Sequence, residues 1–173
     1  MEREEFGKRN IQMILTVGNK VVYPSQGPCR IGHIIKRDVG GTLIKFYHLL
    51  ALDGSGGEMY VPVDKAQDIG VRLLLKRSEI PKLFGQLKRA DYTAGNGRQQ
   101  AIDNSKLFSS GSPFDLAFIV EALTELRETK ALTIGQSRTL EKARRLLICE
   151  ISEVLEATRE EAERQLDQAL KAH

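Results

Sequence analysis

Cysteine and histidine are scarce in this sequence, and it has no long apolar run. The 173 residues include two cysteines and three histidines, none of them in a CxxC or HxxxH pattern, so neither a disulfide framework nor a conventional zinc site is expected. No apolar run approaches the roughly 20 residues of a membrane span. The GxSxG, HExxH and GK[ST] motifs are also absent. These absences favour a binding protein over an enzyme, with no metal or other cofactor, no membrane and no small-molecule substrate.

One group of residues keeps a chemical alternative open. Cys29, His33 and His48 lie in strand-like runs, and neighbouring strands can bring such residues together. A metal site or a Cys/His-based enzyme is therefore one interpretation. The other is that Cys29 and Cys149 are buried as small hydrophobic residues.

The first twelve residues, Met1 to Gln12, are charged and lack the apolar stretch of a signal peptide. We expect residues 1–12 to be either a disordered extension or the product of an upstream start codon, and the protein to be cytoplasmic.

The N-terminal half has the pattern of a small β-domain. A β-branched run over residues 17–23 ends at a turn with Pro24 and Gly27, and a second apolar run follows. Two more runs occupy residues 42–52 and 58–63, separated by a glycine-rich loop. Four strands without an intervening helix pattern predict a small closed barrel, in which closure removes exposed edges.

Beyond about residue 72 the apolar period changes from 2 to 3.6. A first helix is predicted behind a Ser78 cap, and a weaker one from about residue 98 to 109. Helix starts are predicted at Ser112, Thr133 and Thr158, each from a capping residue. Residues 73–173 should therefore form an all-helical bundle, which makes the fold class α+β.

Charge is unevenly distributed in the helical half: the middle of the chain is basic and the last helical region is acidic. Arg138, Lys142 and Arg145 are spaced i, i+4 and i+7, so they form one positive stripe on the helix that begins at Thr133. Such a stripe is either a solvated helix face or a contact for a phosphate backbone.

Several motifs resemble the CarD/CdnL family of bacterial transcription regulators. They are VGNKVVYPSQG at residues 17–27, YVPV at 60–63, IGVR at 69–72 and LTIGQSRTLEKARRLL at 132–147. The resemblance implies a Tudor-like (SH3-like) barrel over residues 13–72, shared with the transcription-repair coupling factor, that binds the β-subunit lobe of RNA polymerase. It also implies that residues 73–173 contact promoter DNA and stabilise the open complex.

The resemblance also suggests individual contacts. Arg37 and Val39 match a basic and an apolar polymerase contact of the family, and Tyr60 stands where close relatives have an arginine. Pairing of an edge strand with the β lobe is the implied mode of attachment. For DNA, Arg98 represents the basic residues that follow the family's tryptophan, and the stripe of Arg138, Lys142 and Arg145 implies phosphate contacts.

The family's DNA-wedging tryptophan is missing, because this chain contains no tryptophan. Gly97 occupies its position, and a glycine cannot act as a wedge between base steps. Either Tyr92 substitutes, or contact with DNA is purely electrostatic, which we favour. A polymerase-binding adaptor that has lost contact with promoter DNA is the alternative.

Overall fold

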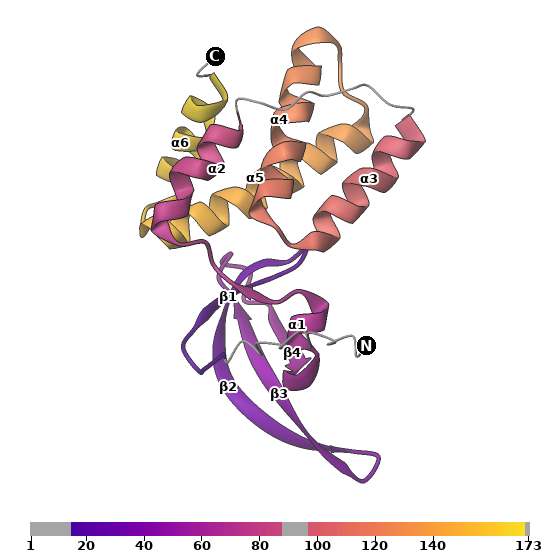
Figure 1. Ribbon diagram of the computed structural model, residues 1–173, viewed down its shortest axis with the longest axis vertical. Helices are drawn as coiled ribbons and strands as arrows, with labels where there is room; N and C mark the ends of the chain where they lie inside the picture. The colour runs from indigo at the N-terminus through magenta and orange to yellow at the C-terminus, as the bar shows by residue number, and fades with distance from the viewer. Residues whose placement is uncertain (1–14, 88–96, 172–173) are drawn as a thin grey trace, which may run out of the picture.

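A β-domain and a helical domain follow one another along the chain and pack end to end (Figure 1). The computed structural model describes residues 15–87 and 97–171, except for the side chains of residues 97–103. The predicted α+β class is confirmed. The expectation of a disordered extension at residues 1–12 lies outside the described residues, as does Tyr92.

Five strands form one antiparallel sheet in the order β4-β3-β2-β1-β5. They are β1 (Lys20–Tyr23), β2 (Gly27–Val39), β3 (Thr42–Ala51), β4 (Glu58–Pro62) and β5 (Arg72–Leu73). Four of them match the predicted runs. The fifth, β5, was not predicted because two residues carry no alternation, and the expected boundary between residues 72 and 73 falls within it.

Closure of the sheet differs from the expectation. Within the described residues, β4 and β5 remain at the two edges and no ladder joins them. The 3-10 helix η1 (Val63–Lys65) and helix α1 (Ala66–Ile69) follow β4, and Ala66 packs into the core with Ile31, Tyr47 and Leu49. A short helix therefore helps to enclose the core that the barrel was expected to enclose by strand pairing alone.

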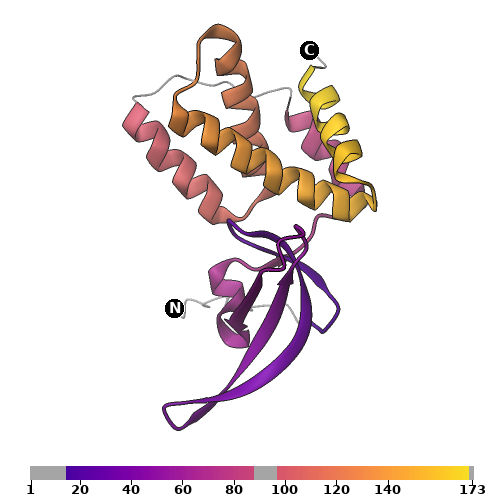
Figure 2. The ribbon, with the colours of Figure 1, turned by 180° about the vertical axis from the view of Figure 1, so that it is seen from behind.

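The β2–β3 hairpin is the longest feature of the β-domain and points away from the helices (Figures 1 and 2). Its tip turns at Gly40 and Gly41, both with positive φ, and Asp38 Oδ1 accepts a hydrogen bond from Gly41 N at 2.8 Å. Glycine suits such positions because it has no Cβ.

The helical domain begins with η2 (Arg77–Glu79) and α2 (Ile80–Gln86) and continues with four longer helices. These are α3 (Gly97–Ser110), α4 (Pro113–Thr129), α5 (Ile134–Leu155) and α6 (Arg159–Lys171). Their apolar faces share one core that includes Leu83, Ile119, Leu147 and Leu166. None of the helices within residues 15–87 and 97–171 has both the length and the apolarity needed to cross a bilayer.

Three of the predicted helix caps are confirmed and one is wrong. Ser112 accepts from Phe114 N, Thr133 and Gln136 form a capping box, and Thr158 accepts from Glu161 N. Ser78, in contrast, lies inside η2. Glu79 explains the difference, since its carboxylate accepts from Lys76 N at 2.8 Å and closes a 3-10 turn ahead of α2.

The two domains are joined by an ion pair whose carboxylate is buried. Arg72 of β5 donates two hydrogen bonds to Glu150 of α5, at 2.7 and 2.9 Å, and a third to Gly111 O at 2.8 Å. The Glu150 side chain is 2% exposed and also accepts from Leu75 N. A bidentate pair of this kind fixes geometry as well as supplying energy.

Two more contacts cross the interface between the domains. Lys20 of β1 pairs with Glu153 of α5 at 2.8 Å, and Arg159 of α6 donates to Leu52 O at 2.6 Å. Charged side chains from both domains therefore help to set the relative orientation of the domains.

Candidate functional site

The three residues expected to contact the polymerase lie on one face of the sheet. Cross-strand pairing aligns His33 with His48 and His48 with Tyr60. Because side chains alternate along a strand, Arg37 and Val39 share the face of His33. We call this face of β2, β3 and β4, carrying Arg37, Val39 and Tyr60, the outer face.

Arg37 and Tyr60 contact each other on the outer face. The guanidinium carbon of Arg37 lies 4.6 Å from the centre of the Tyr60 ring. Tyr60 in turn stacks on His48 at 4.8 Å between ring centres, and His48 on His33 at 5.6 Å. A cation–π contact at an exposed site contributes about 0.5–1 kcal/mol. The tyrosine thus orients the guanidinium through stacking, and no described carboxylate pairs with Arg37.

The outer face has the composition of a protein-binding surface. Tyr60 is 44% and Val39 51% exposed, and the partly buried Ile35, Ile44 and Phe46 lie between them. Aromatic residues and arginine are enriched at interfaces, where they carry most of the binding energy. The face ends at β4, an edge strand of the sheet.

The stripe predicted for the helix after Thr133 lies on α5 as expected. Arg138 and Arg145 are exposed and Lys142 half-buried, whereas Leu140, Ala143 and Leu147 on the opposite side are buried. None of the three cations forms an ion pair with a carboxylate in the part of the chain that the structure describes. Their charge is therefore available to a ligand.

Two further basic residues, Arg144 and Arg98, lie outside the stripe. Arg144, which adds charge beside the stripe, is paired with Glu163 at 3.2 Å and Asp167 at 2.9 Å, so it is neutralised within the protein. Arg98 lies in the first turn of α3, but its side chain is outside the described residues. The roles of all four candidate DNA contacts remain predictions.

The stripe borders two different hollows. Arg138 and Lys142 line one of about 390 Å³ together with Phe108 of α3, whose ring centre is 5.0 Å from Lys142 Nζ. Arg145 lines a second of about 270 Å³, which also contains Glu141 and Glu163. Of these two hollows, only the first has no carboxylate among its described lining residues.

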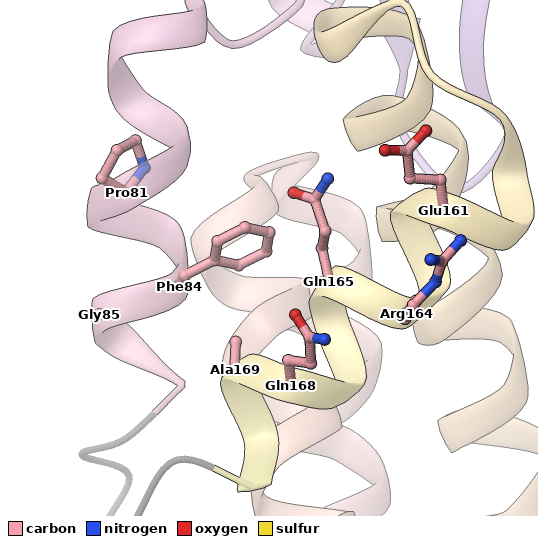
Figure 3. A pocket seen from close by; sticks show the side chains of 8 residues that line it. All are labelled: Pro81, Phe84, Gly85, Glu161, Arg164, Gln165, Gln168 and Ala169. Carbon is pink, nitrogen blue, oxygen red and sulfur yellow. The ribbon is translucent and has the colours of Figure 1, made fainter.

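A third hollow, of about 680 Å³, lies between α2 and α6 (Figure 3). Phe84 points from α2 toward Gln165 and Gln168 of α6, and Glu161 and Arg164 lie on the same helix as the glutamines. Its charges are balanced, so electrostatics gives it no preference for an anion or a cation.

The Cys29, His33 and His48 group does not assemble into a site. Cys29 is buried in the core, whereas the two histidines stack on the outer face. Burial, followed by the negative charge of Asp53, raises the pKa of the Cys29 thiol to about 11. No cluster of three histidine, cysteine or acidic side chains suited to a metal ion occurs among the described residues.

Sequence reasoning missed the ion pair of Arg72 and Glu150. Glu150 belongs by sequence to the acidic last helical region, yet it is one of the most buried side chains of α5. Its position carried a signal, because Ala143, Leu147 and Glu150 fall on one helix face, at i, i+4 and i+7. A carboxylate on an apolar stripe indicates a buried partner.

Comparison with known proteins covers both domains. Residues 15–73 match the CarD-like/TRCF RID domain, and residues 82–167 match the CarD C-terminal domain. The solution NMR structure of the 72-residue N-terminal domain of Myxococcus xanthus CarD is 39% identical over 34% of this chain and 77% of its own, with a TM-score of 0.30. Because the two matched domains, residues 15–73 and 82–167, together cover most of the chain, it belongs to the CarD/CdnL family of RNA polymerase-interacting transcription regulators.

Proposed function

We propose that the outer face binds the β-subunit lobe of RNA polymerase and that the helical domain stabilises the promoter open complex. The observation that carries this proposal is the Arg37–Tyr60 contact on an exposed face beside the edge strand β4. An edge strand supplies unpaired backbone groups for strand addition, and flanking side chains supply specificity.

The helical domain acts through its positive stripe. Arg138, Lys142 and Arg145 contact phosphates of promoter DNA, and Arg98 is expected to add a fourth contact. Contacts that form only after melting shift the equilibrium toward the open complex by their differential free energy. A contribution of about 1 to 3 kcal/mol changes open-complex occupancy some five- to hundredfold.

Binding to the isolated β-subunit lobe tests the first half of the proposal. Arg37→Glu is expected to weaken binding at least about tenfold, because it reverses a charge and removes the cation–π contact. Lys36→Glu is the matched control, since Lys36 is the exposed neighbour on the opposite face of β2. Equal losses for the two variants would indicate a general charge effect and count against the outer face.

An adaptor that no longer contacts promoter DNA is the second candidate. It is favoured by the absence of tryptophan and by Gly97 at the start of α3, where the family's wedge is expected. The two candidates differ in one assay. Under the first proposal, the native chain prolongs the lifetime of the open complex on promoter DNA, and Arg138→Gln prolongs it less. Under the second proposal, neither the native chain nor the variant changes this lifetime.

A binding protein is proposed in preference to an enzyme, with a cytoplasmic location where the polymerase acts. The raised pKa of Cys29 supports this choice, because a thiol with a pKa of about 11 is protonated at neutral pH and is a poor nucleophile. Unchanged behaviour of a Cys29→Ser variant in the polymerase assays is the expected result.

A further inference from the structure

The hollow beside Arg138 is built by both domains. Helix α3 contributes Ser105, Phe108 and Ser109, helix α5 contributes Arg138 and Lys142, and the β1–β2 turn of the β-domain contributes Ser25. Its volume of about 390 Å³ is within the range of small-ligand pockets, about 300–1,000 Å³.

The charge of this hollow distinguishes it from its neighbours. Among the described residues that line it, Arg138 and Lys142 are the only charged ones, and neither is paired with a described carboxylate. The hollows near Arg145 and near Phe84 each include at least one glutamate. Of the three hollows, the one beside Arg138 therefore offers an anion two cations that are unpaired within the described residues.

The donors of the hollow suit a tetrahedral oxyanion. Ser25 and Ser105 have hydroxyls without a hydrogen-bond partner in the described part of the chain, whereas Ser109 donates to Ser105 O at 2.9 Å. The Lys142 ammonium lies over the Phe108 ring, which positions it at the wall of the hollow. Guanidinium, ammonium and hydroxyl groups are the donors that bind phosphate oxygens.

We propose that this hollow is a binding site for the phosphate group of a small molecule, either a free nucleotide or inorganic phosphate. The inference goes beyond the proposed function, because it assigns a small-molecule site that the β-domain helps to build and that depends on neither polymerase binding nor DNA binding. Since Ser25 and Arg138 come from different domains, the bound phosphate also stabilises the docked arrangement of the domains.

Binding of inorganic phosphate by the full chain is the first test. It is measured by calorimetry and by the unfolding temperature, in sodium phosphate against sodium chloride at equal ionic strength. Arg138→Gln and Lys142→Gln are each expected to weaken phosphate binding at least about tenfold, as loss of a charge-assisted donor implies.

Arg127→Gln is the matched control, because it removes the same charge from an exposed arginine of α4 that belongs neither to the stripe nor to the lining of the hollow. Its phosphate affinity is expected to change less than about twofold, since an exposed charge that does not contact the ligand is largely screened by salt. Ser25→Gly is a second variant. Ser25 has φ +66°, which glycine adopts freely, so the fold is retained while phosphate binding weakens.

Adenosine diphosphate and duplex DNA separate a small-molecule site from a DNA contact. If Arg138→Gln weakens binding of inorganic phosphate or adenosine diphosphate more than Arg127→Gln does, the proposal is supported, and tighter binding of adenosine diphosphate than of phosphate indicates a free nucleotide. If only binding to duplex DNA differs between the two variants, the hollow is part of the DNA contact of the proposed function, and the proposal is overturned. It is also overturned if none of the three ligands distinguishes Arg138→Gln from Arg127→Gln.

Failure of this site and failure of the proposed function give different results. Arg37→Glu is expected to lose binding to the β lobe and to retain phosphate binding. Arg138→Gln is expected to lose phosphate binding and to retain binding to the β lobe.

Discussion

Replacing Glu150 by glutamine should destabilise the protein more than any other single removal of charge at the interface between the domains. The Glu150 carboxylate accepts two hydrogen bonds from Arg72 and one from Leu75 N, and its side chain is 2% exposed. Glutamine keeps the shape but has one acceptor oxygen, and its NH₂ group faces the guanidinium donors. Arg72 is then left without its counter-charge.

The size of the effect follows from burial. Removing one partner of a buried ion pair costs about 3–5 kcal/mol. Because the Arg72 side chain is 23% exposed, water compensates part of the loss, and we expect about 2–4 kcal/mol. For a chain of this size that lowers the unfolding temperature by about 5–12 °C.

Urea unfolding followed by circular dichroism measures this loss, with Glu153→Gln as the control. Glu153 pairs with Lys20 at 2.8 Å across the same interface, but both side chains are partly exposed, at 22% and 33%. The control should therefore lose less than about 1 kcal/mol. Equal losses for the two variants would refute the argument, since the two carboxylates differ in burial and in the number of hydrogen bonds that they accept.

A double variant separates the ion pair from simple packing. Arg72→Met with Glu150→Leu removes both charges, and such apolar replacements of buried pairs are often neutral or stabilising. The double variant should therefore be more stable than either single one. Additive losses would show that the two side chains do not interact energetically.

Three further predictions concern single sites. Because burial raises the pKa of Cys29 from 9.0 to about 11, the unfolded chain loses this proton first, so the free energy of unfolding should fall between pH 9 and 11 and fall less in Cys29→Ala. Thr133→Ala removes the capping box of α5 and should cost about 1 kcal/mol, whereas Ser78→Ala, at a residue that caps no helix, should cost almost nothing in the same urea titration. Gly27→Ala should cost about 1–3 kcal/mol, because φ is +96° and a Cβ would lie 3.1 Å from Leu146 Cδ2; an unchanged urea midpoint would contradict this.

Local features of the fold were predictable from the sequence because their causes are local. The caps at Ser112, Thr133 and Thr158 depend on residues two or three positions away, and the burial of Leu140 and Leu147 on α5 follows from helical periodicity. Strand β5 was missed because its two residues form a strand only through pairing with β1, some 50 positions earlier.

The candidate site was predictable only in part, for the same reason. A resemblance of motifs pointed to Arg37 and Tyr60, but their contact results from the register of β2, β3 and β4. Ser25 carried no functional signal, because its neighbours in the hollow come from α3 and α5. Sites formed by several elements depend on tertiary contacts, which the periodicity and capping patterns of a sequence do not predict.

Coupling between the domains leads to a last prediction, which depends on the proposed function. The outer face belongs to the β-domain and the stripe to α5, and the Arg72–Glu150 ion pair fixes one relative to the other. A fixed orientation raises the effective concentration of the stripe at the DNA once the β-domain is bound. Glu150→Gln should therefore leave affinity for the isolated β lobe unchanged but shorten the open-complex lifetime several-fold relative to Glu153→Gln, at a temperature where both variants are folded. Equal lifetimes would mean that the interface between the domains serves stability alone, and reduced lobe binding would mean that the ion pair also shapes the outer face.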